Sequence, residues 1–564
     1  MTLIWGTLVV FLFVYSLYVL LNIHKRKRFP PSPTGFPILG HLHLLAGKNP
    51  HNDLQKLAKK HGPIMYVQLG LVPAIVASSV DAVEKFLKTN DHIFASRPHS
   101  EASQYLSYGQ KNLIFAKYGV YWRNMRKLCT VHLLSNHKIN SFQSMRKQEV
   151  QLLIESIKKE AHDRVVVDLS ARILSLNANL TCLMMFGKKY MDEDLDKRGF
   201  KAIVQDVVDL VSTPNLGDFF PFLGVIDLQG LNRKLKDLSK VFDEFLERII
   251  DEHVEYHDRD QTKDFVDTMM DIMQSGEAEF QFDRRHIKAI LLDMLLAAMD
   301  TTASTAEWIL TELLRHPQVM KKLQNELQEV VGLERMVEES DLENLNYLNM
   351  VVNEGLRLHP AVPLFFHEAM EDCVVDDFHI QKGSRIIINC YAIHRDPNVW
   401  PDPEKFFPGR FVGTLHQKRP LALYSVQMSW SRPINTYVNV HRISRRNTSE
   451  KITKVLNSAA AVPNSTAVVP ISAAVVLISI ADHLSFIEGR RRRNIQSKKE
   501  LGQNGSSIDF RGRDFQLLPF GSGRRSCPGM QLGVTIVRLM VAQLVHCFEW
   551  ELPNGIEPCD LDID

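Results

Sequence analysis

The stretch that most constrains the fold of this chain is residues 520–529, which read FGSGRRSCPG. Glycines on both sides of Cys527 allow the backbone to pass close to a flat ligand. Cys527 lies just before an expected helix, where backbone N–H groups favour a thiolate, and Arg524 and Arg525 add positive charge. Phe520 can shield the sulfur from water. The loop therefore predicts a soft anionic ligand in a dry pocket rich in donors, which suits iron held by one thiolate.

Other interpretations of this loop are open from its residues alone. One is a glycine-rich turn around a buried structural cysteine. Phosphate binding is disfavoured, because Ser526 stands where a GxGxxG motif needs its third glycine. Seven cysteines in 564 residues, with no CxxC spacing, argue against a disulfide framework or a zinc cluster. A net charge of +2 excludes the broad basic field of a nucleic-acid-binding protein, so no nucleic-acid partner is expected.

The first 23 residues carry the pattern of a membrane anchor. Residues 3–23 contain no charged side chain, which is long enough to cross a hydrocarbon core of about 30 Å, and the basic cluster 24–28 follows at once. A cleaved signal peptide would carry its charge before a shorter apolar stretch. By the positive-inside rule, everything after the cluster is cytosolic. A buried core helix is the alternative. Four prolines within residues 30–37 then predict a stiff, extended hinge.

The patterns of the remaining chain predict an α+β fold that is mainly helical with a minor β-sheet. A helix at 53–60 precedes short β-branched runs at 64–69 and 73–78, and a second strand-rich patch covers 373–390. Helical periodicity dominates from 116 to 316. The clearest amphipathic helices are expected at 145–162, 235–257 and 284–314, with a last helix beginning near Met530.

The cysteine loop resembles the FxxGxRxCxG signature of the cytochrome P450 haem-thiolate monooxygenases, and every fixed position is filled. Five further motifs occur in the order of that family: the proline-rich hinge 30–37, WxxxR at 122–126, the central-helix motif at 297–302, ExxR at 354–357 and a PERF-like stretch at 407–411. The resemblance covers residues 1–413 and 508–564 and is closest to plant microsomal members. It implies the cytochrome P450 fold, haem (heme b) with an axial thiolate, and O2 as co-substrate.

By this resemblance, Cys527 is the axial ligand of the haem iron, because a thiolate pushes electron density toward bound dioxygen. Phe520 belongs to the same haem-binding loop. Arginine suits the two haem propionates, since its fork binds carboxylates and keeps its charge when buried. The residues expected at the propionates are Trp122, Arg126, Arg525 and His367, the last at a place where related chains carry a basic group.

Asp300 and Thr301 resemble the catalytic acid–alcohol pair of the family. An acid and an alcohol inside an apolar helix are costly unless they are used, and they can relay protons to the reacting oxygen. The alternative is a threonine that bonds back to its own helix carbonyl. Ala298 stands where the family has glycine.

Glu354 and Arg357 lie three residues apart, on one helix face, and Arg410 would complete a structural charged triad that pins the cysteine loop. A solvated surface pair is the alternative. An apolar pocket with few polar anchors would take a lipophilic substrate. Its expected lining is Ile114, Phe115, Asp293, Ala297, Val362, Leu364 and Phe365.

The resemblance implies a monooxygenase that inserts one atom of O2 into a lipophilic small molecule, such as a plant terpenoid or phenylpropanoid. No Rossmann or flavin motif is present, so electrons from NADPH would arrive through a partner, NADPH–cytochrome P450 reductase, received by a basic face that includes Lys127 and Arg524. Membrane lipid is a further partner. The expected location is the endoplasmic reticulum membrane, as a single-pass protein with a cytosolic catalytic domain. A haem-thiolate rearrangement enzyme is disfavoured by the Asp300–Thr301 pair.

Two departures from the family pattern define the predicted domains. These are an anchor (1–23), a basic stop and hinge (24–40), the first part of the catalytic domain (41–413), an atypical insertion (414–507), and the haem-binding loop with the C-terminal helix (508–564). We interpret 414–507 as a translated intron or gene-annotation error, and the body can tolerate its cost in loop-closure entropy if the insertion stays outside. The C-terminus also looks short of the family's end. A non-catalytic or misfolded product is therefore the alternative function.

Overall fold

The computed structural model describes residues 29–45, 47, 49–163, 165–190, 199–255, 262–412, 437–442, 508, 510–553 and 561. The predicted anchor, the basic stop up to residue 28 and nearly all of the predicted insertion lie outside the described residues. The chain divides into two units. The first, Met1–His441 with Ile508–Asp564, holds the fold described below, and the second is Arg442–Ser507.

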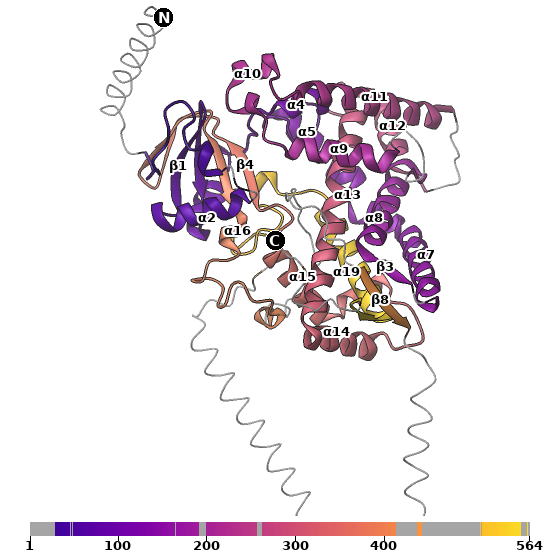
Figure 1. Ribbon diagram of the computed structural model, residues 1–564. Coiled ribbons are helices and arrows are strands. Elements are labelled where there is room, and N and C mark those ends of the chain that lie inside the picture. Colours follow the sequence, from indigo (N-terminus) through magenta and orange to yellow (C-terminus); the bar gives the residue numbers. More distant parts are fainter. Residues whose placement is uncertain are drawn as a thin grey trace, which may run out of the picture. The chain divides into compact units, whose positions relative to one another are not determined.

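A four-stranded sheet forms beside the helices, in the order β1-β2-β7-β4 (Figure 1). Its strands are β1 (Ile64–Leu69), β2 (Val72–Ala77), β7 (Arg385–Asn389) and β4 (Leu364–Glu368). β1 and β2 form an antiparallel hairpin, β2 runs parallel to β7, and β7 is antiparallel to β4. Both faces of this sheet are buried, and the alternation of side chains along each strand sends neighbouring residues to different apolar clusters. Ile75 and Ile386 join one apolar cluster, and Val76 and Ile387 join another with Leu54 of α2 (Pro50–His61).

The helices make up most of the fold. They are, beyond α2, α3 (Val80–Glu84), α4 (Glu101–Leu106), α5 (Val120–Leu128), α6 (Asn136–Ser141), α7 (Gln143–His162), α8 (Leu169–Phe186), α9 (Phe200–Ser212), α10 (Pro221–Ile226), α11 (Leu231–Glu255), α12 (Phe265–Ser275), α13 (Arg284–Arg315), α14 (Pro317–Val330), α15 (Asn346–Leu358), α16 (Cys390–Ile393) and α19 (Met530–Cys547).

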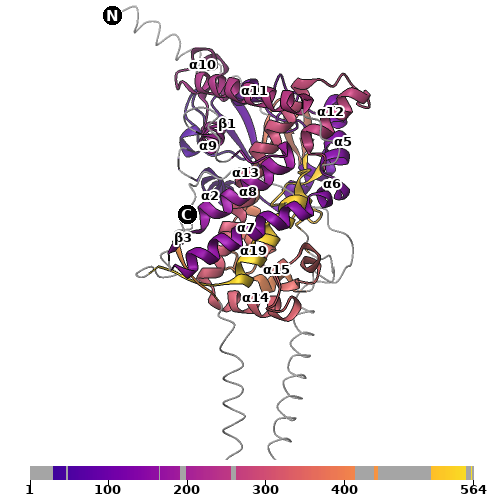
Figure 2. The same cartoon turned by 90° about the vertical axis from the view of Figure 1, so that its right-hand side faces the viewer.

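Helix α13 forms the centre of the largest apolar core, and α8 and α19 lie against it (Figures 1 and 2). Asp283 begins this helix, because its carboxylate accepts hydrogen bonds from Arg285 N at 3.0 Å and His286 N at 3.3 Å. Pro317 follows its end and starts α14. The helix crosses the whole core and can place side chains near several distant segments.

Two smaller sheets complete the fold. β5 (Cys373–Val375) pairs with β6 (Phe378–Ile380), and a three-stranded sheet has the order β3-β8-β9. Its strands are β3 (Val166–Asp168), β8 (Tyr437–Arg442) and β9 (Phe548–Glu551). β8 belongs to the predicted insertion and pairs antiparallel with β3, Val438 opposite Val167. This part of the insertion therefore joins the body rather than staying outside it.

The expected fold class is confirmed: the described chain is mainly helical with small sheets. The helices expected at 53–60, 145–162, 235–257 and 284–314 are present, with ends that differ by a few residues, as is usual for helix boundaries. The proline-rich hinge lies against β1 from its start, because Tyr66 N donates to Pro31 O at 2.9 Å. A tertiary hydrogen bond therefore holds the start of the hinge in place, in addition to the stiffness that its prolines give.

Three helices of the described part are long and apolar enough to cross a membrane: α8, α13 and α19. Between 67% and 72% of each apolar stretch is buried within the protein. These helices therefore build the core.

Candidate functional site

The cysteine loop connects an extended segment to α19. Gly521 and Gly523 both have φ of +69°, a left-handed conformation that favours glycine. A Cβ atom at Gly523 would also lie 2.8 Å from Leu87 O. Both the backbone conformation and the lack of space therefore require glycine there. Cys527 is half-buried, and Gly529 N donates to its Sγ at 3.2 Å, one residue before α19 begins. The sulfur therefore stands at a helix start that offers a donor, which stabilises a thiolate.

Arg525 of this loop is buried and anchored by backbone carbonyls. Its Nε donates to Ala95 O at 2.6 Å and its Nη2 to Ala116 O at 2.5 Å. The guanidinium lies 4.1 Å from the centre of the Trp122 ring, whose Nε1 donates to Leu113 O at 3.0 Å. Tryptophan is the aromatic side chain that best stabilises a cation over its face. α5 and the cysteine loop are thus joined through this pair.

Two further arginines lie close to Arg525. Arg126 of α5 donates from Nη2 to Ser526 Oγ at 3.4 Å, and Arg97 donates to Phe366 O of β4. Burial lowers the pKa of all three guanidiniums, and the charge of Arg126 lowers the pKa of Arg97 further. The charges of Arg97 and Arg126 also lower the pKa of Arg525.

No carboxylate pairs with any of these three arginines among the residues that the structure describes. Three neighbouring cations that are partly out of water are costly without a counter-charge. The arginine cluster (Arg97, Arg126, Arg525) therefore suits an anionic ligand, and the forked guanidinium is well matched to carboxylates. Sequence analysis missed Arg97, since a lone arginine in a loop carries no periodic or motif signal.

His367 lies in β4 near the cluster, but it is not a further cation. Its Nδ1 donates to Phe94 O at 2.8 Å. Burial, and then the charge of Arg97, lower the pKa of His367 to about 3, so the imidazole is neutral at physiological pH. A contact of His367 with a propionate stays a prediction, and it would be a hydrogen bond rather than an ion pair.

Helix α13 carries Asp300 and Thr301 beside each other. Thr301 is buried and its Oγ1 donates to Ala297 O at 2.6 Å, which is the helix back-bond considered from the sequence. Burial raises the pKa of Asp300, and Ser304 Oγ lies 3.5 Å from its Oδ1. Ala297, one turn earlier on this mostly buried helix, is exposed. Both side chains can carry a proton, and a change of the Thr301 rotamer would release its hydroxyl from Ala297 O.

Asn177 of α8 is a residue that sequence analysis missed. It is buried, and its Nδ2 donates to Ala298 O at 2.8 Å and to Met299 O at 2.5 Å on α13. These two hydrogen bonds tie α8 to α13 directly before Asp300. α8 carries several other polar residues, so nothing in the sequence singled out Asn177. Figure 2 shows α8 and α13 crossing at the centre of the fold.

Asp293 of α13 holds the loop that contains two of the expected pocket residues. Its carboxylate accepts from Asn112 Nδ2 at 2.8 Å, Leu113 N at 2.6 Å and Ile114 N at 3.0 Å. Burial raises the pKa of Asp293 to about 7 despite these donors. The carboxylate is therefore engaged with backbone. Ile114 and Phe115 are half-buried in this loop.

The other expected pocket residues are not all brought together. Phe365 packs with Val362 in one apolar cluster, whereas Leu364 packs against the cluster on the opposite face of the sheet. Successive strand residues point to opposite faces. At most one of Leu364 and Phe365 can therefore face a given pocket.

Glu354, Arg357 and Arg410 form a connected ion-pair group. Glu354 and Arg357 are fully buried, and Arg357 Nε lies 2.8 Å from Glu354 Oε2. Arg410 Nε lies 2.9 Å from Glu354 Oε1. Arg357 also donates to the carbonyls of His394 and Pro403, both at 2.7 Å. The group holds the segment after β7 in place, and its role toward the cysteine loop stays a prediction.

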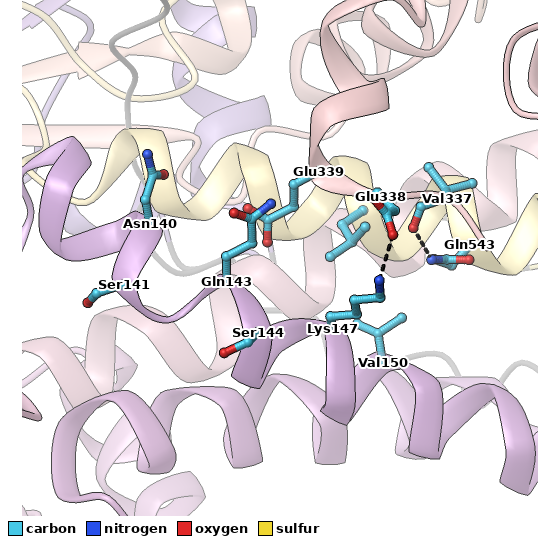
Figure 3. A pocket seen from close by; sticks show the side chains of 11 residues that line it. Asn140, Ser141, Gln143, Ser144, Lys147, Val150, Val337, Glu338, Glu339 and Gln543 are labelled. Atoms are coloured by element: carbon cyan, nitrogen blue, oxygen red, sulfur yellow. Dashed lines mark hydrogen bonds and ion pairs between the residues drawn. The ribbon is translucent and has the colours of Figure 1, made fainter. Parts of the chain in front are cut away.

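A cavity of about 390 Å³ lies elsewhere, between α6, α7, the segment 337–339 and α19 (Figure 3). Lys147 pairs with Glu338 across it at 2.5 Å, and Gln543 Nε2 donates to Val337 O at 2.5 Å. None of its lining residues is a predicted site residue.

Comparison with known proteins agrees with this geometry. A model of the Cytochrome P450 family matches residues 30–422 and 500–564, leaving 423–499 unmatched. Cytochrome P450 CYP736A12 of Panax ginseng is 41% identical over 557 residues, covering 97% of this chain and 92% of that protein. Cytochrome P450 750A1 of Pinus taeda is 33% identical, covering 98% and 91%. Norfluorocurarine oxidase of a Strychnos species is 33% identical, covering 95% and 89%. The chain belongs to the cytochrome P450 family of haem-thiolate monooxygenases.

Proposed function

We propose that this chain binds haem through Cys527 and uses it to insert one atom of O2 into a lipophilic small molecule. The observation that carries the proposal is the arginine cluster. Three partly buried cations stand beside the cysteine loop with no carboxylate partner in the described chain, and the two propionates of haem would supply the missing charge. The residues present therefore fit the cofactor of the family.

When bound, haem supplies the activation of O2. The chain's own residues then divide into three tasks. Gly529 N–H holds the Cys527 sulfur, and the buried Phe520 of the same loop shields it from water. Arg97, Arg126 and Arg525 hold the carboxylates, with Trp122 packed against Arg525. Asp300 and Thr301 have the third task, which is to deliver protons.

Asp300 and Thr301 are the proposed proton donors. Burial raises the pKa of Asp300 above its ordinary value, which makes this carboxyl a better proton carrier than an exposed aspartate. Thr301 Oγ1 donates to Ala297 O at 2.6 Å. After a change of rotamer the hydroxyl would give this proton to the reacting oxygen, and the Asp300 carboxyl would replace it. Asn177 fixes the carbonyls of the adjacent turn, so that the two groups keep their places on α13.

Electrons are proposed to come from NADPH through a separate reductase, because no dinucleotide or flavin motif occurs in the chain. Lys127 and Arg524, the basic residues expected to receive it, are exposed, but Lys127 pairs with Glu279 at 2.7 Å and Arg524 with Asp91 at 3.0 Å. A docking reductase would exchange these surface pairs for its own carboxylates. The name of one relative, Norfluorocurarine oxidase, supports an oxidative reaction.

An exposed apolar surface supports the proposal that the protein is membrane-bound; the endoplasmic reticulum is proposed from its plant cytochrome P450 relatives. Large apolar side chains are exposed on α10 and on two further segments. Leu71 N donates to Phe219 O, two residues before α10, at 2.9 Å, and Gly70 N donates to Leu39 O at 3.3 Å. This apolar rim consists of Phe36, Ile38, Leu39, Leu71, Phe222, Val225, Ile226 and Leu228. Val225 is 90% exposed. The rim begins eight residues after the predicted basic stop, where lipid would lie.

Carbon monoxide binding tests the proposed haem thiolate. The full chain is expressed in microsomes, reduced and exposed to carbon monoxide, beside the variant Cys527→Ser. We expect a thiolate-ligated band in the natural chain and its loss in the variant. A natural chain without that band would support the non-catalytic alternative. Microsomes that also hold a plant reductase and NADPH are then tested with terpenoids and phenylpropanoids for oxygenated products.

Vesicle binding tests the membrane proposal. We expect Val225→Asp to weaken binding to phosphatidylcholine vesicles, and Leu152→Asp on α7, which is also exposed, to leave it unchanged. Equal binding by both variants would contradict the role of the rim.

A further inference from the structure

Both backbone groups of Leu518, two residues before Phe520, are held by side chains from another part of the chain. Leu518 N donates to His394 Nε2 at 2.7 Å. Cys390 Sγ donates to Leu518 O at 3.2 Å. Cys390, His394 and Leu518 are all fully buried. Cys390 and His394 lie four residues apart, at the start and just past the end of α16, so one short element supplies both contacts.

The hydrogen bonds of His394 fix its tautomer. Because Nε2 accepts from Leu518, the ring proton is on Nδ1, which donates to Arg357 O at 3.0 Å. Arg357 Nη1 in turn donates to His394 O at 2.7 Å. The two residues are therefore bonded in both directions, and a neutral imidazole satisfies every contact. Nδ1 thus contacts α15 and Nε2 contacts Leu518, and Cys390 Sγ also lies 3.3 Å from Nε2.

These contacts link the buried ion pair to the cysteine loop. Arg357 and Glu354 bond to one another and to the backbone of residues 403–407. Their described hydrogen bonds do not reach residues 515–529. His394 is the side chain that contacts Arg357 on one side and Leu518 on the other. It therefore transmits the position of α15 to the segment that leads into the cysteine loop.

We propose that His394, together with Cys390, is a positioning residue that fixes Leu518 and thereby the sulfur of Cys527. This inference rests on the proposed haem-thiolate function, but the contacts themselves can be tested without it. His394 acts through the loop and does not touch the reacting atoms. Cys390 is a hydrogen-bond donor in this clamp, and burial raises the pKa of its thiol, so the proton stays on sulfur.

Hydrogen exchange at Leu518 tests the clamp directly. The variants are His394→Ala, Cys390→Ala and Cys390→Ser, since serine can still donate to Leu518 O. The matched control is His359→Ala. His359 is a nearby histidine that bonds Glu312 at 2.8 Å and stacks on Trp308, with no described contact to the cysteine loop. We expect the peptide with Leu518 to exchange about tenfold faster in His394→Ala and unchanged in His359→Ala. Equal exchange in these two variants would overturn the proposal.

A second measurement follows the consequence for the sulfur. The reduced, carbon monoxide-bound proteins are warmed stepwise, and loss of the thiolate-ligated band is compared with loss of helix signal. We expect His394→Ala to lose the band before it loses helix, Cys390→Ala to do so more weakly, and His359→Ala to lose both together. Loss in parallel in all three would refute a positioning role. A natural chain without the band would instead refute the proposed function. The hydrogen-exchange experiment would then still test whether His394 and Cys390 hold Leu518.

Discussion

The substitution Glu354→Gln tests how much one buried charge supports this fold. Glu354 accepts four hydrogen bonds: two from Arg357 at 2.8 and 3.0 Å, one from Arg410 Nε at 2.9 Å and one from Phe407 N at 2.8 Å. Glutamine keeps the shape, removes the charge and turns one acceptor into a donor that faces donors. Arg357, which is fully buried, would then lack a carboxylate.

Breaking a buried ion pair from one side costs about 3–5 kcal/mol. The matched surface change is Glu338→Gln. Glu338 pairs with Lys147 at 2.5 Å, but the two side chains are 45% and 60% exposed. An exposed pair contributes about 0–1 kcal/mol. The loss in free energy of unfolding should therefore be several kcal/mol larger for Glu354→Gln than for Glu338→Gln.

The assay is urea unfolding of the detergent-solubilised chain, followed by far-ultraviolet circular dichroism, with haem content measured on the same samples. We expect Glu354→Gln to unfold at a much lower urea concentration and to retain less haem, and Glu338→Gln to match the natural chain. Equal midpoints for the two variants would refute the reasoning, because they would mean that burial adds nothing to this ion pair.

Further predictions concern other parts of the chain. Asp293→Asn should lower the free energy of unfolding by about 1–3 kcal/mol and speed hydrogen exchange in residues 112–115, because the buried backbone donors lose an acceptor. The pKa of His367 is about 3 in the folded chain, below its unfolded value of about 6.5, so the unfolded chain takes up the proton first as pH falls. The free energy of unfolding should therefore be unaffected by His367 above pH 6.5 and fall as the pH drops below it, by roughly 2 kcal/mol at pH 5. His367→Gln should remove this part of the pH dependence in urea titrations. Thr301→Val should lower product formed per NADPH by at least about tenfold in a reductase-coupled assay, with haem content unchanged. If 414–507 is a translated intron, mass spectrometry of the native protein should yield no peptides from it, and their recovery would contradict that interpretation.

Local pattern determined the elements of the fold. The strand at 64–69 and the helix from 284 were predictable because alternation and the 3.6-residue period are written in neighbouring residues. Cys527, Arg525 and the ExxR residues were named from fixed spacings within short motifs. A motif of this kind carries its chemistry in a few consecutive residues, so it can be recognised before the chain is folded.

Contacts between distant segments could not be predicted in this way. Arg97 joins Arg126 and Arg525 although more than 400 residues separate the first from the last. Asn177 reaches the carbonyls of another helix, and β8 of the predicted insertion pairs with β3. Each partner is specified by how helices and strands pack, which no local pattern records.

By itself, the sequence determined the family, the cysteine that we propose as the iron ligand and most of the described helices, because these depend on short-range periodicity and on motifs. Only the tertiary structure decided which cations gather beside that sulfur, that Leu364 and Phe365 face opposite sides, and that His394 connects Arg357 to Leu518. The physical reason is that burial and hydrogen bonding act between surfaces in contact, and those surfaces exist only after the chain has folded.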